Sequence, residues 1–320
     1  MARRRLMNAD ISPLVSVNIP CYRQLDYFRQ SLDSVRAQTF TNFEVNVLDD
    51  GDSEDYRRYI DSLGDNRIRY RKNPVRLGAM ANMFEAMHAG EGKYTLAFHE
   101  DDLLSPDYMK AAVEILESRE DCGFVAAEVR EFANDLPAMQ RQRVGPIPYD
   151  VFTSSSEFLR GIFKGIEPMF GSVVYRRAAL EGAQPDHQRY GTLVDRPFLL
   201  SILTRWTAAV IREPLAWYRG HGSNDNRHEG MSADNILELL KTYRATLPEK
   251  MHIRDEALFF PYAADWLSIL YRLTPDDRKP PAARFMFQAW RAGLYNPRWE
   301  RHFGLSRLRG ALKDSRKYRS

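Results

Sequence analysis

Strand-like and helix-like segments alternate over the first 130 residues, and this alternation constrains the fold more than any other feature of the sequence. Short apolar, β-branched runs fall at residues 14–19, 43–48, 68–71 and 94–98, with amphipathic helical patterns at residues 25–38 and 78–89. A further helix is expected after Ser105-Pro106-Asp107, which supplies a cap and a first-turn proline. Strands that alternate with helices in this way favour an α/β fold with a largely parallel sheet covered on both faces.

Polar clusters follow three of these predicted strands. They are residues 20–23, residues 49–50 and residues 100–102, each placed where an apolar run ends. Ligands of open α/β sheets bind beyond the carboxyl ends of the strands. The sequence therefore predicts one ligand site that all three clusters share.

The acidic run Glu100-Asp101-Asp102 is the strongest candidate for chemistry. Three adjacent carboxylates repel one another unless a cation or hydrogen-bond donors offset their charge. A hard divalent ion such as Mg²⁺ or Mn²⁺ does so, taking one or two carboxylates and completing its shell with phosphate oxygens. The alternative is a solvated loop that caps the helix beginning near Pro106. The apolar strand before the run and its place at the binding edge favour the metal site.

Other candidates near this edge each have an ordinary structural alternative. Asp50 could accept from a base N–H or a ribose hydroxyl, or simply belong to an Asp-Gly turn. Tyr22 could offer an aromatic face to a nucleobase, or pack at the start of a helix. Gly78 allows close backbone approach and Asn82 can bond a base or ribose, but both also suit the start of a helix.

The second half of the chain is less regular. Residues 133–150 contain three prolines and predict a long loop. A strand is expected at 170–175, a helix at 192–203, and a strand at 207–211, and the pattern is helical beyond residue 232.

Composition excludes several classes of protein. A hydrophobic content of 44% suits a packed domain, and a net charge of +3 is too small to indicate nucleic-acid binding. Cys21 and Cys122 lie in apolar surroundings without metal-ligand spacing, which favours a reducing cytoplasm. No segment has the pattern of a membrane span or a signal peptide. Residues 301–320 carry seven Lys or Arg against Asp314, a basic amphipathic tail that predicts either peripheral contact with anionic lipid or a solvated helix.

Several linked motifs resemble the opening of the family 2 glycosyltransferases, which have the GT-A fold. They are PLVSVNIPCY at 13–22, LDSVRAQTF at 32–40, and FEV at 43–45 leading to DDGDS at 49–53. The resemblance is highly specific over residues 13–120, looser to about 225, and negligible beyond 235. It implies a mixed, mainly parallel sheet flanked by helices that binds a nucleoside diphosphate sugar and inverts the anomeric centre. The helical C-terminal extension is expected from the pattern beyond residue 232.

The resemblance assigns roles to the nucleotide-side residues. Pro20 and Tyr22 would line the base pocket and Asp50 would read the base. Gly78 and Asn82 would flank the nucleoside. UDP- and dTDP-sugars both suit these residues.

The family's acidic metal motif corresponds to residues 99–102. Asp102 is the expected direct ligand of Mn²⁺ or Mg²⁺, and Asp101 would touch ribose or metal. Many members have aspartate where this chain has His99, so the resemblance leaves the number of protein ligands open.

The later motifs are also matched. Gly171 resembles the glycine of the loop beside the donor sugar, and Asp195 resembles the catalytic base, although the acidic residue that often precedes it is Val194 here. His221, in the segment from Trp217 to Ser223, would complete the metal site, and Arg219 would pair with the diphosphate. From the residues alone, Asp195 would be a helix-capping acid.

These inferences define the expected organisation: a tail at 1–12, a nucleotide-sugar-binding half at 13–130, an acceptor-side half at 131–231, and a helical region at 232–320. The expected acceptor is a glycan, a lipid-linked glycan or a small molecule, and a homodimer is compatible with the sequence.

Three other functions have sequence requirements that can be compared with this chain. A sugar nucleotidyltransferase needs a glycine-rich phosphate loop after the first strand, where this chain has PCYRQ, and a dehydrogenase needs GxGxxG there. A non-catalytic nucleotide- or glycan-binding module remains an alternative because of His99 and Val194.

Overall fold

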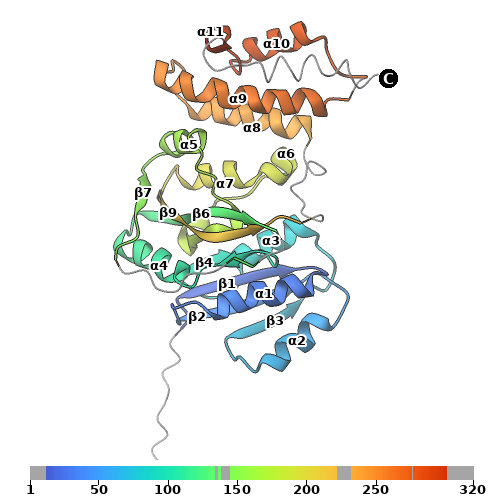
Figure 1. Ribbon diagram of the computed structural model, residues 1–320, viewed down its shortest axis with the longest axis vertical. Coiled ribbons are helices and arrows are strands. Elements are labelled where there is room, and N and C mark those ends of the chain that lie inside the picture. Colours follow the sequence, from blue (N-terminus) through green and yellow to red (C-terminus); the bar gives the residue numbers. More distant parts are fainter. Residues whose placement is uncertain (1–11, 134–135, 138–144, 222–231, 276, 301–320) are drawn as a thin grey trace, which may run out of the picture. The chain divides into compact units, whose positions relative to one another are not determined.

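The computed structural model describes residues 12–133, 136–137, 145–221, 232–275 and 277–300 (Figure 1). The chain forms two compact units. Unit 1 comprises residues 1–148, 170–181 and 211–219, and unit 2 comprises residues 149–169, 182–210 and 220–320.

Unit 1 is built on four parallel strands in the order β3-β2-β1-β4. They are β1 (Val15–Cys21), β2 (Phe43–Asp49), β3 (Ile68–Lys72) and β4 (Tyr94–Ala97). β1 and β4 are buried along almost their whole length, as their continuous apolar sequences require in a sheet covered on both faces. Three of the four predicted strands match these within a residue, and β1 runs two residues beyond its predicted end. It includes Pro20, because β4 pairs with β1 only as far as Asn18 and a ladder donor is not needed beyond that point.

The sheet continues beyond β4 with β8, β6, β9 and β5, while β7 pairs with β9. These strands are β5 (Leu103–Leu104), β6 (Cys122–Phe132), β7 (Tyr149–Phe152), β8 (Val173–Arg176) and β9 (Thr207–Arg219). The pairs β4–β8, β6–β8 and β5–β9 are antiparallel. The sheet is therefore mixed, and the expected α/β architecture is confirmed.

The helices of unit 1 follow its strands in sequence. They are α1 (Leu25–Arg36), α2 (Asp55–Leu63), α3 (Ala79–His88) and α4 (Tyr108–Ser118). α1 buries Phe28, Leu32 and Val35 completely, the one-face spacing of an amphipathic helix. The buried faces of these helices pack in the core and hold in place the strand ends that form the site.

Unit 2 is mainly helical. Its helices are α5 (Ser155–Phe163), α6 (His187–Tyr190), α7 (Asp195–Ile202), α8 (Ala233–Thr246), α9 (Ile253–Leu273), α10 (Ala282–Arg291) and α11 (Pro297–Glu300). Ser232 and Asn235 form a capping box that starts α8. Aromatic rings join the helices, with Phe163 of α5 lying 4.8 Å from Tyr262 of α9 and 5.9 Å from Tyr243 of α8 between centroids.

Parts of the predicted secondary structure were wrong. The expected strand at 170–175 begins as a 3-10 turn, Phe170–Ser172, before β8. The strand expected at 207–211 extends to Arg219, and β6 was not predicted.

Both cysteines are free and buried. Within the part of the chain that the structure describes, no helix is long and apolar enough to span a bilayer.

Candidate active site

The candidate site lies where the strand order of unit 1 reverses. From β1 the chain proceeds outward to β2 and β3, whereas β4 lies on the other side of β1. Such a switch point separates the loops after the two neighbouring strands and leaves room for a ligand at their carboxyl ends. The loop after β1 begins at Tyr22, and the loop after β4 contains residues 98–102.

The loop after β4 gathers His99, Asp101 and Asp102. Nδ1 of His99 lies 2.9 Å from Oδ2 of Asp102, and ligand atoms of all three residues lie within 4.8 Å of one another. Asp102 is only 6% exposed. Burial raises the pKa of Asp102, while the bond with His99 opposes that shift. A buried carboxylate with a second carboxylate nearby is an arrangement that a cation would stabilise.

The geometry of this group fits a divalent ion. Two ligands at about 2.1 Å from a metal and at right angles to each other are about 3 Å apart, which is the separation of His99 Nδ1 and Asp102 Oδ2. Oδ1 of Asp102 is occupied by the backbone N–H of Arg219 at 3.0 Å, which fixes the carboxylate orientation. The sequence comparison left the role of His99 open, and the structure places its ring in the same group as the two aspartates.

Gly171 packs directly against this group. A Cβ atom at this position would lie 3.2 Å from both Asp102 Oδ2 and His99 Nδ1. A side chain at residue 171 would therefore crowd the acidic loop, and His99 or Asp102 would have to shift by a few tenths of an ångström to make room. The sequence predicted a loop glycine beside the donor, and the structure brings Gly171 to the predicted metal motif.

Arg219, at the end of β9, is held in several ways. Its Nε donates to the backbone oxygen of Asp101 at 2.7 Å and its Nη2 donates to Gln30 Oε1 at 2.8 Å. The guanidinium carbon also lies 4.6 Å from the ring centroid of Tyr27 and 4.5 Å from that of Phe132.

The side chain of Arg219 is only 3% exposed, and burial lowers its pKa. These contacts make Arg219 a support for the acidic loop. Its contact with a diphosphate stays a prediction.

Asp50 organises the loop after β3. Its Oδ1 accepts from Leu77 N at 2.7 Å and Asn73 Nδ2 at 2.9 Å, and its Oδ2 accepts from Gly78 N at 2.8 Å. Burial alone would raise the pKa of Asp50, but these three donors and the charge of Arg76 hold it below its usual value. The predicted base-reading residue is thus also the anchor of the loop that leads into α3.

We expect Asp50→Asn to reduce the free energy of unfolding by about 1–3 kcal/mol. In the variant, the amide nitrogen would replace one carboxylate oxygen and would face a backbone N–H to which it cannot bond. Because the folded-state pKa is lowered, the stabilisation is present above the ordinary carboxyl pKa of about 3.9 and is lost as pH falls through the lowered value. Urea denaturation of both proteins at pH 7 and at lower pH measures it. Asp52→Asn is the control, since Asp52 is exposed and its solvent-screened pair with Arg23 contributes little to stability. Equal stability of Asp50→Asn and the parent would contradict this role.

Asn82 is buried behind the same loop. It is 2% exposed, its Nδ2 donates to the backbone oxygen of Leu48 at 2.9 Å, and its Oδ1 accepts from Asn73 at 2.9 Å. Its predicted contact with a nucleoside is not tested by these bonds, which give it a role in holding the loop. Gly78, with φ of 86°, precedes α3 and supplies the left-handed backbone that the turn requires.

Tyr22 begins the loop after β1, two residues after Pro20, the penultimate residue of that strand. The guanidinium of Arg76 lies 4.3 Å from the Tyr22 ring centroid. The backbone N–H of Tyr22 donates to Glu100 Oε1 at 2.7 Å, and Tyr56 Oη donates to Glu100 Oε2 at 2.6 Å. Burial raises the pKa of Glu100 to about 7. Glu100 therefore ties the loop after β1 to the loop after β4, a structural role that its place in the acidic run did not reveal.

Asp195 is the first residue of α7 in unit 2. The preceding 3-10 turn, Gly191–Leu193, begins at a glycine with φ of 54°, and Pro197 lies in the first turn of the helix. Oδ1 of Asp195 accepts from the backbone N–H of Arg196 at 2.8 Å, and the helix N-terminus stabilises the carboxylate charge. Asp195 is partly exposed.

Arg196 is fixed beneath this turn, since its Nη1 donates to Tyr262 Oη at 2.7 Å. His221 is the last described residue before a stretch that the structure does not describe, and it is partly buried. Whether it completes the metal site stays a prediction.

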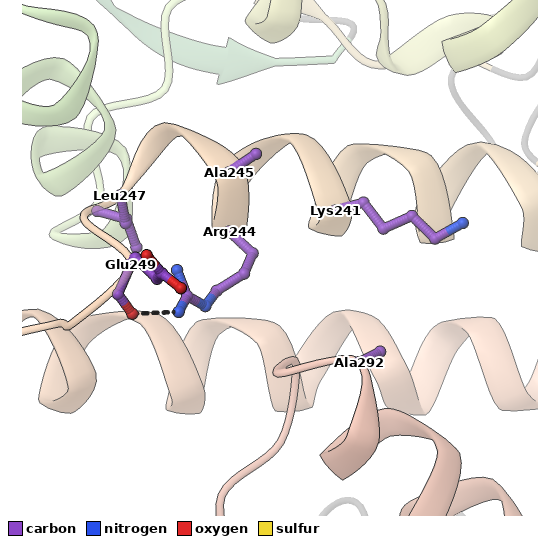
Figure 2. Close-up of a pocket in the computed structure, with 6 residues that line it drawn as sticks. All are labelled: Lys241, Arg244, Ala245, Leu247, Glu249 and Ala292. Carbon is purple, nitrogen blue, oxygen red and sulfur yellow. Dashed lines mark hydrogen bonds between the residues drawn. The ribbon is translucent and has the colours of Figure 1, made fainter.

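Unit 2 also contains a cavity of about 320 Å³ (Figure 2). It is lined by Lys241, Arg244, Ala245, Leu247, Glu249 and Ala292. Arg244 Nη2 donates to the backbone oxygen of Glu249 at 2.8 Å, so the guanidinium closes the turn that follows α8. None of the predicted site residues lines this cavity.

Comparison with known proteins agrees with this arrangement. The family model described as "Glycosyl transferase family 2" matches residues 16–181. An uncharacterized glycosyltransferase of Rickettsia typhi is 32% identical over 105 residues, which are 33% of this chain and 32% of that protein. The chain thus matches about a third of the length of that relative. A protein of Bacillus subtilis named "Putative glycosyltransferase EpsH" is 24% identical over 257 residues, covering 76% of this chain and 72% of EpsH.

Two solved structures share the fold. S. aureus TarS 1-349 in complex with UDP-GlcNAc has a TM-score of 0.56 and 14% identity, covering 95% of this chain and 93% of that one. The mannosyltransferase PcManGT of Pyrobaculum calidifontis, in complex with GDP-Man and Mn²⁺, has a TM-score of 0.53 and 16% identity, covering 97% and 89%. The family match spans just over half of the chain and contains the acidic motif, Asp50 and Gly171. The chain therefore belongs to glycosyl transferase family 2.

Proposed function

We propose that this protein transfers a sugar from a nucleoside diphosphate sugar, UDP- or dTDP-linked, to an acceptor hydroxyl with inversion and with the help of Mn²⁺ or Mg²⁺. The observation that carries the proposal is the His99, Asp101 and Asp102 group at the switch point of the sheet. Family membership and the nucleotide sugars bound to TarS and PcManGT support the donor class.

The residues divide the reaction between them. In this proposal, Asp101 and Asp102 hold the cation together with His99, and His221 adds a further ligand. A divalent cation bound there would act as a Lewis acid and stabilise the charge that develops on the departing diphosphate. The loop that Asp50 anchors holds the nucleoside, together with Pro20, Tyr22, Gly78 and Asn82. Gly171 lets its turn lie directly against the metal motif, and Arg219 supports the acidic loop.

Asp195 would accept the proton of the attacking hydroxyl. Asp195 is a partly exposed residue at the start of α7, which suits a general base that must reach a bound acceptor. A single displacement then inverts the anomeric centre without a glycosyl-enzyme intermediate.

The proposal also names an acceptor class. The acceptor is a glycan, a lipid-linked glycan or a small molecule. Peripheral membrane contact through residues 301–320 and homodimer formation belong to the same proposal, and the tail lies outside the described residues. The protein is proposed to act in the cytoplasm.

A thermal-shift screen with UDP, dTDP and GDP, each with and without Mn²⁺, tests the donor and the metal together. A nucleotide present at about 100 times its Kd stabilises the folded state by about 2.7 kcal/mol, which raises the Tm by several degrees. We expect UDP or dTDP to do so only when Mn²⁺ is present. No shift with any nucleotide would contradict the proposal, and a shift with GDP alone would change the donor.

The second candidate function is a binding module of the same fold without catalysis, which His99 and Val194 suggest because both depart from the family pattern. An assay for slow hydrolysis of a nucleotide sugar to free nucleoside diphosphate distinguishes the transferase from the binding module. A transferase should release the diphosphate slowly, and the release should depend on Asp195. A module would bind the donor and release nothing.

A further inference from the structure

The helix α10 buries one face and leaves an aromatic pair exposed on the other. Phe285 and Ala289 are 8% and 6% exposed, and Phe285 packs against Tyr271 of α9 with ring centroids 5.0 Å apart. Phe287 and Trp290 are 55% and 53% exposed. Their rings lie together, with centroids 5.8 Å apart. Large aromatic rings that are paired and half exposed in this way mark a surface that another phase or molecule covers.

Arginines flank this pair along the helix. Arg284 lies three residues before Phe287 and Arg291 lies four residues after it, so all three share one side of α10, and both arginines are exposed. The charge extends beyond the helix. Residues 278–299 contain five Lys or Arg and no Asp or Glu. We call Arg284, Phe287, Trp290 and Arg291 the α10 aromatic face.

We propose that the α10 aromatic face docks on a membrane surface that contains anionic lipid. Aromatic rings partition to the boundary between headgroups and acyl chains, and arginines beside them bind the phosphates above. The charge argues against a second copy of this chain as the occupant. A two-fold symmetric contact through this face would bring the arginines of both copies together, and like charges across an interface are unfavourable.

The α10 aromatic face shares no residue with the basic tail at 301–320, and the proposal does not depend on the transferase proposal. A protein that docks through α10 needs Phe287 and Trp290 as well as positive charge, whereas a protein that docks through the tail alone does not need these two rings. Substitutions of Phe287 and Trp290 distinguish these two modes, because they leave every charge in place.

Co-sedimentation of the full chain with vesicles tests the proposal. We expect binding to vesicles of phosphatidylcholine with about 30% phosphatidylglycerol, and weak binding to phosphatidylcholine alone. The double substitution F287S/W290S is expected to reduce the partition coefficient at least about tenfold, because burial of both rings is lost. R284Q/R291Q is expected to reduce it about 25-fold on the anionic vesicles only, at about fivefold for each arginine.

Ile253→Ser is the matched control, since Ile253 is 56% exposed on α9 and lies outside the α10 aromatic face. It should leave vesicle binding unchanged. All of the substituted side chains are exposed, and far-UV circular dichroism and Tm confirm that each variant folds. The proposal is overturned if F287S/W290S binds the anionic vesicles as tightly as the parent. It is also overturned if light scattering shows a dimer that F287S/W290S converts to a monomer while the parent does not bind vesicles.

Discussion

Asp195→Asn is expected to lower kcat for sugar transfer by about 100- to 10,000-fold, the usual contribution of a general base, while the Kd of the nucleoside diphosphate stays unchanged. The amide keeps the size of the side chain and an oxygen that can still accept from the backbone N–H of Arg196. The start of α7 should therefore keep its structure. Only the capacity to take a proton from the acceptor is removed. Initial rates with a saturating donor, together with calorimetric titration of UDP, give kcat and Kd separately.

Asp234→Asn is the matched control for this substitution. Asp234 also lies in the first turn of a helix of unit 2, and it is exposed. We expect the control to transfer sugar at the rate of the parent. Normal turnover in Asp195→Asn would remove Asp195 from the catalytic role, and a weakened Kd for UDP would indicate that the residue acts in donor binding instead.

Asp102→Asn is expected to reduce metal-dependent transfer by about 1000-fold, because Lewis-acid stabilisation of the leaving group is worth several kcal/mol. The substitution removes the negative charge that a cation needs and leaves Oδ1 available to the backbone N–H of Arg219. The Kd for Mn²⁺, measured by titration in the presence of UDP, should rise in parallel with the loss of rate.

Asp107→Asn serves as the control, since Asp107 is a nearby carboxylate whose oxygen accepts from Thr39. Its Kd for Mn²⁺ should equal that of the parent. An Asp102→Asn variant with an unchanged manganese titration would show that the ion binds elsewhere. A variant that keeps the parent's Kd for Mn²⁺ but binds UDP more weakly would show that Asp102 holds the nucleotide directly.

The regular part of the fold could be predicted from the sequence because it depends on local patterns. Apolar runs marked β1 to β4, and amphipathic spacing marked α1 and α3. The acidic loop was found for the same reason, since His99, Asp101 and Asp102 are neighbours in sequence as well as in space. Features that depend on close approach between distant segments could not be found in this way.

Gly171 and Arg219 illustrate that limit. The pattern at residues 170–175 predicts a strand, but Gly171 lies in a turn that packs against His99 and Asp102. These two residues precede it in the chain by 72 and 69 positions. The sequence gives no partner for Arg219. In the structure, its guanidinium donates hydrogen bonds to Asp101 and Gln30 and lies close to the rings of Tyr27 and Phe132. Periodicity carries no information about such long-range partners.

Asn82 and Asp50 show a further limit, the dual use of a polar residue. Their residue types suit nucleoside recognition, and the motif resemblance assigns them to it. The structure adds the bonds that connect them to Asn73, Leu48 and the backbone at Leu77 and Gly78. A sequence motif does not distinguish a residue that touches the ligand from one that shapes the loop beside it.

The imidazole of His99 beside two carboxylates has a practical consequence for purification. Affinity of nitrogen- and oxygen-containing sites for divalent ions rises from manganese through cobalt to nickel and copper, and an imidazole nitrogen strengthens that trend. At the proposed metal site, Ni²⁺ from an affinity resin would therefore compete with Mn²⁺ or Mg²⁺. Dialysis against a chelator before reconstitution should be part of any assay of this protein.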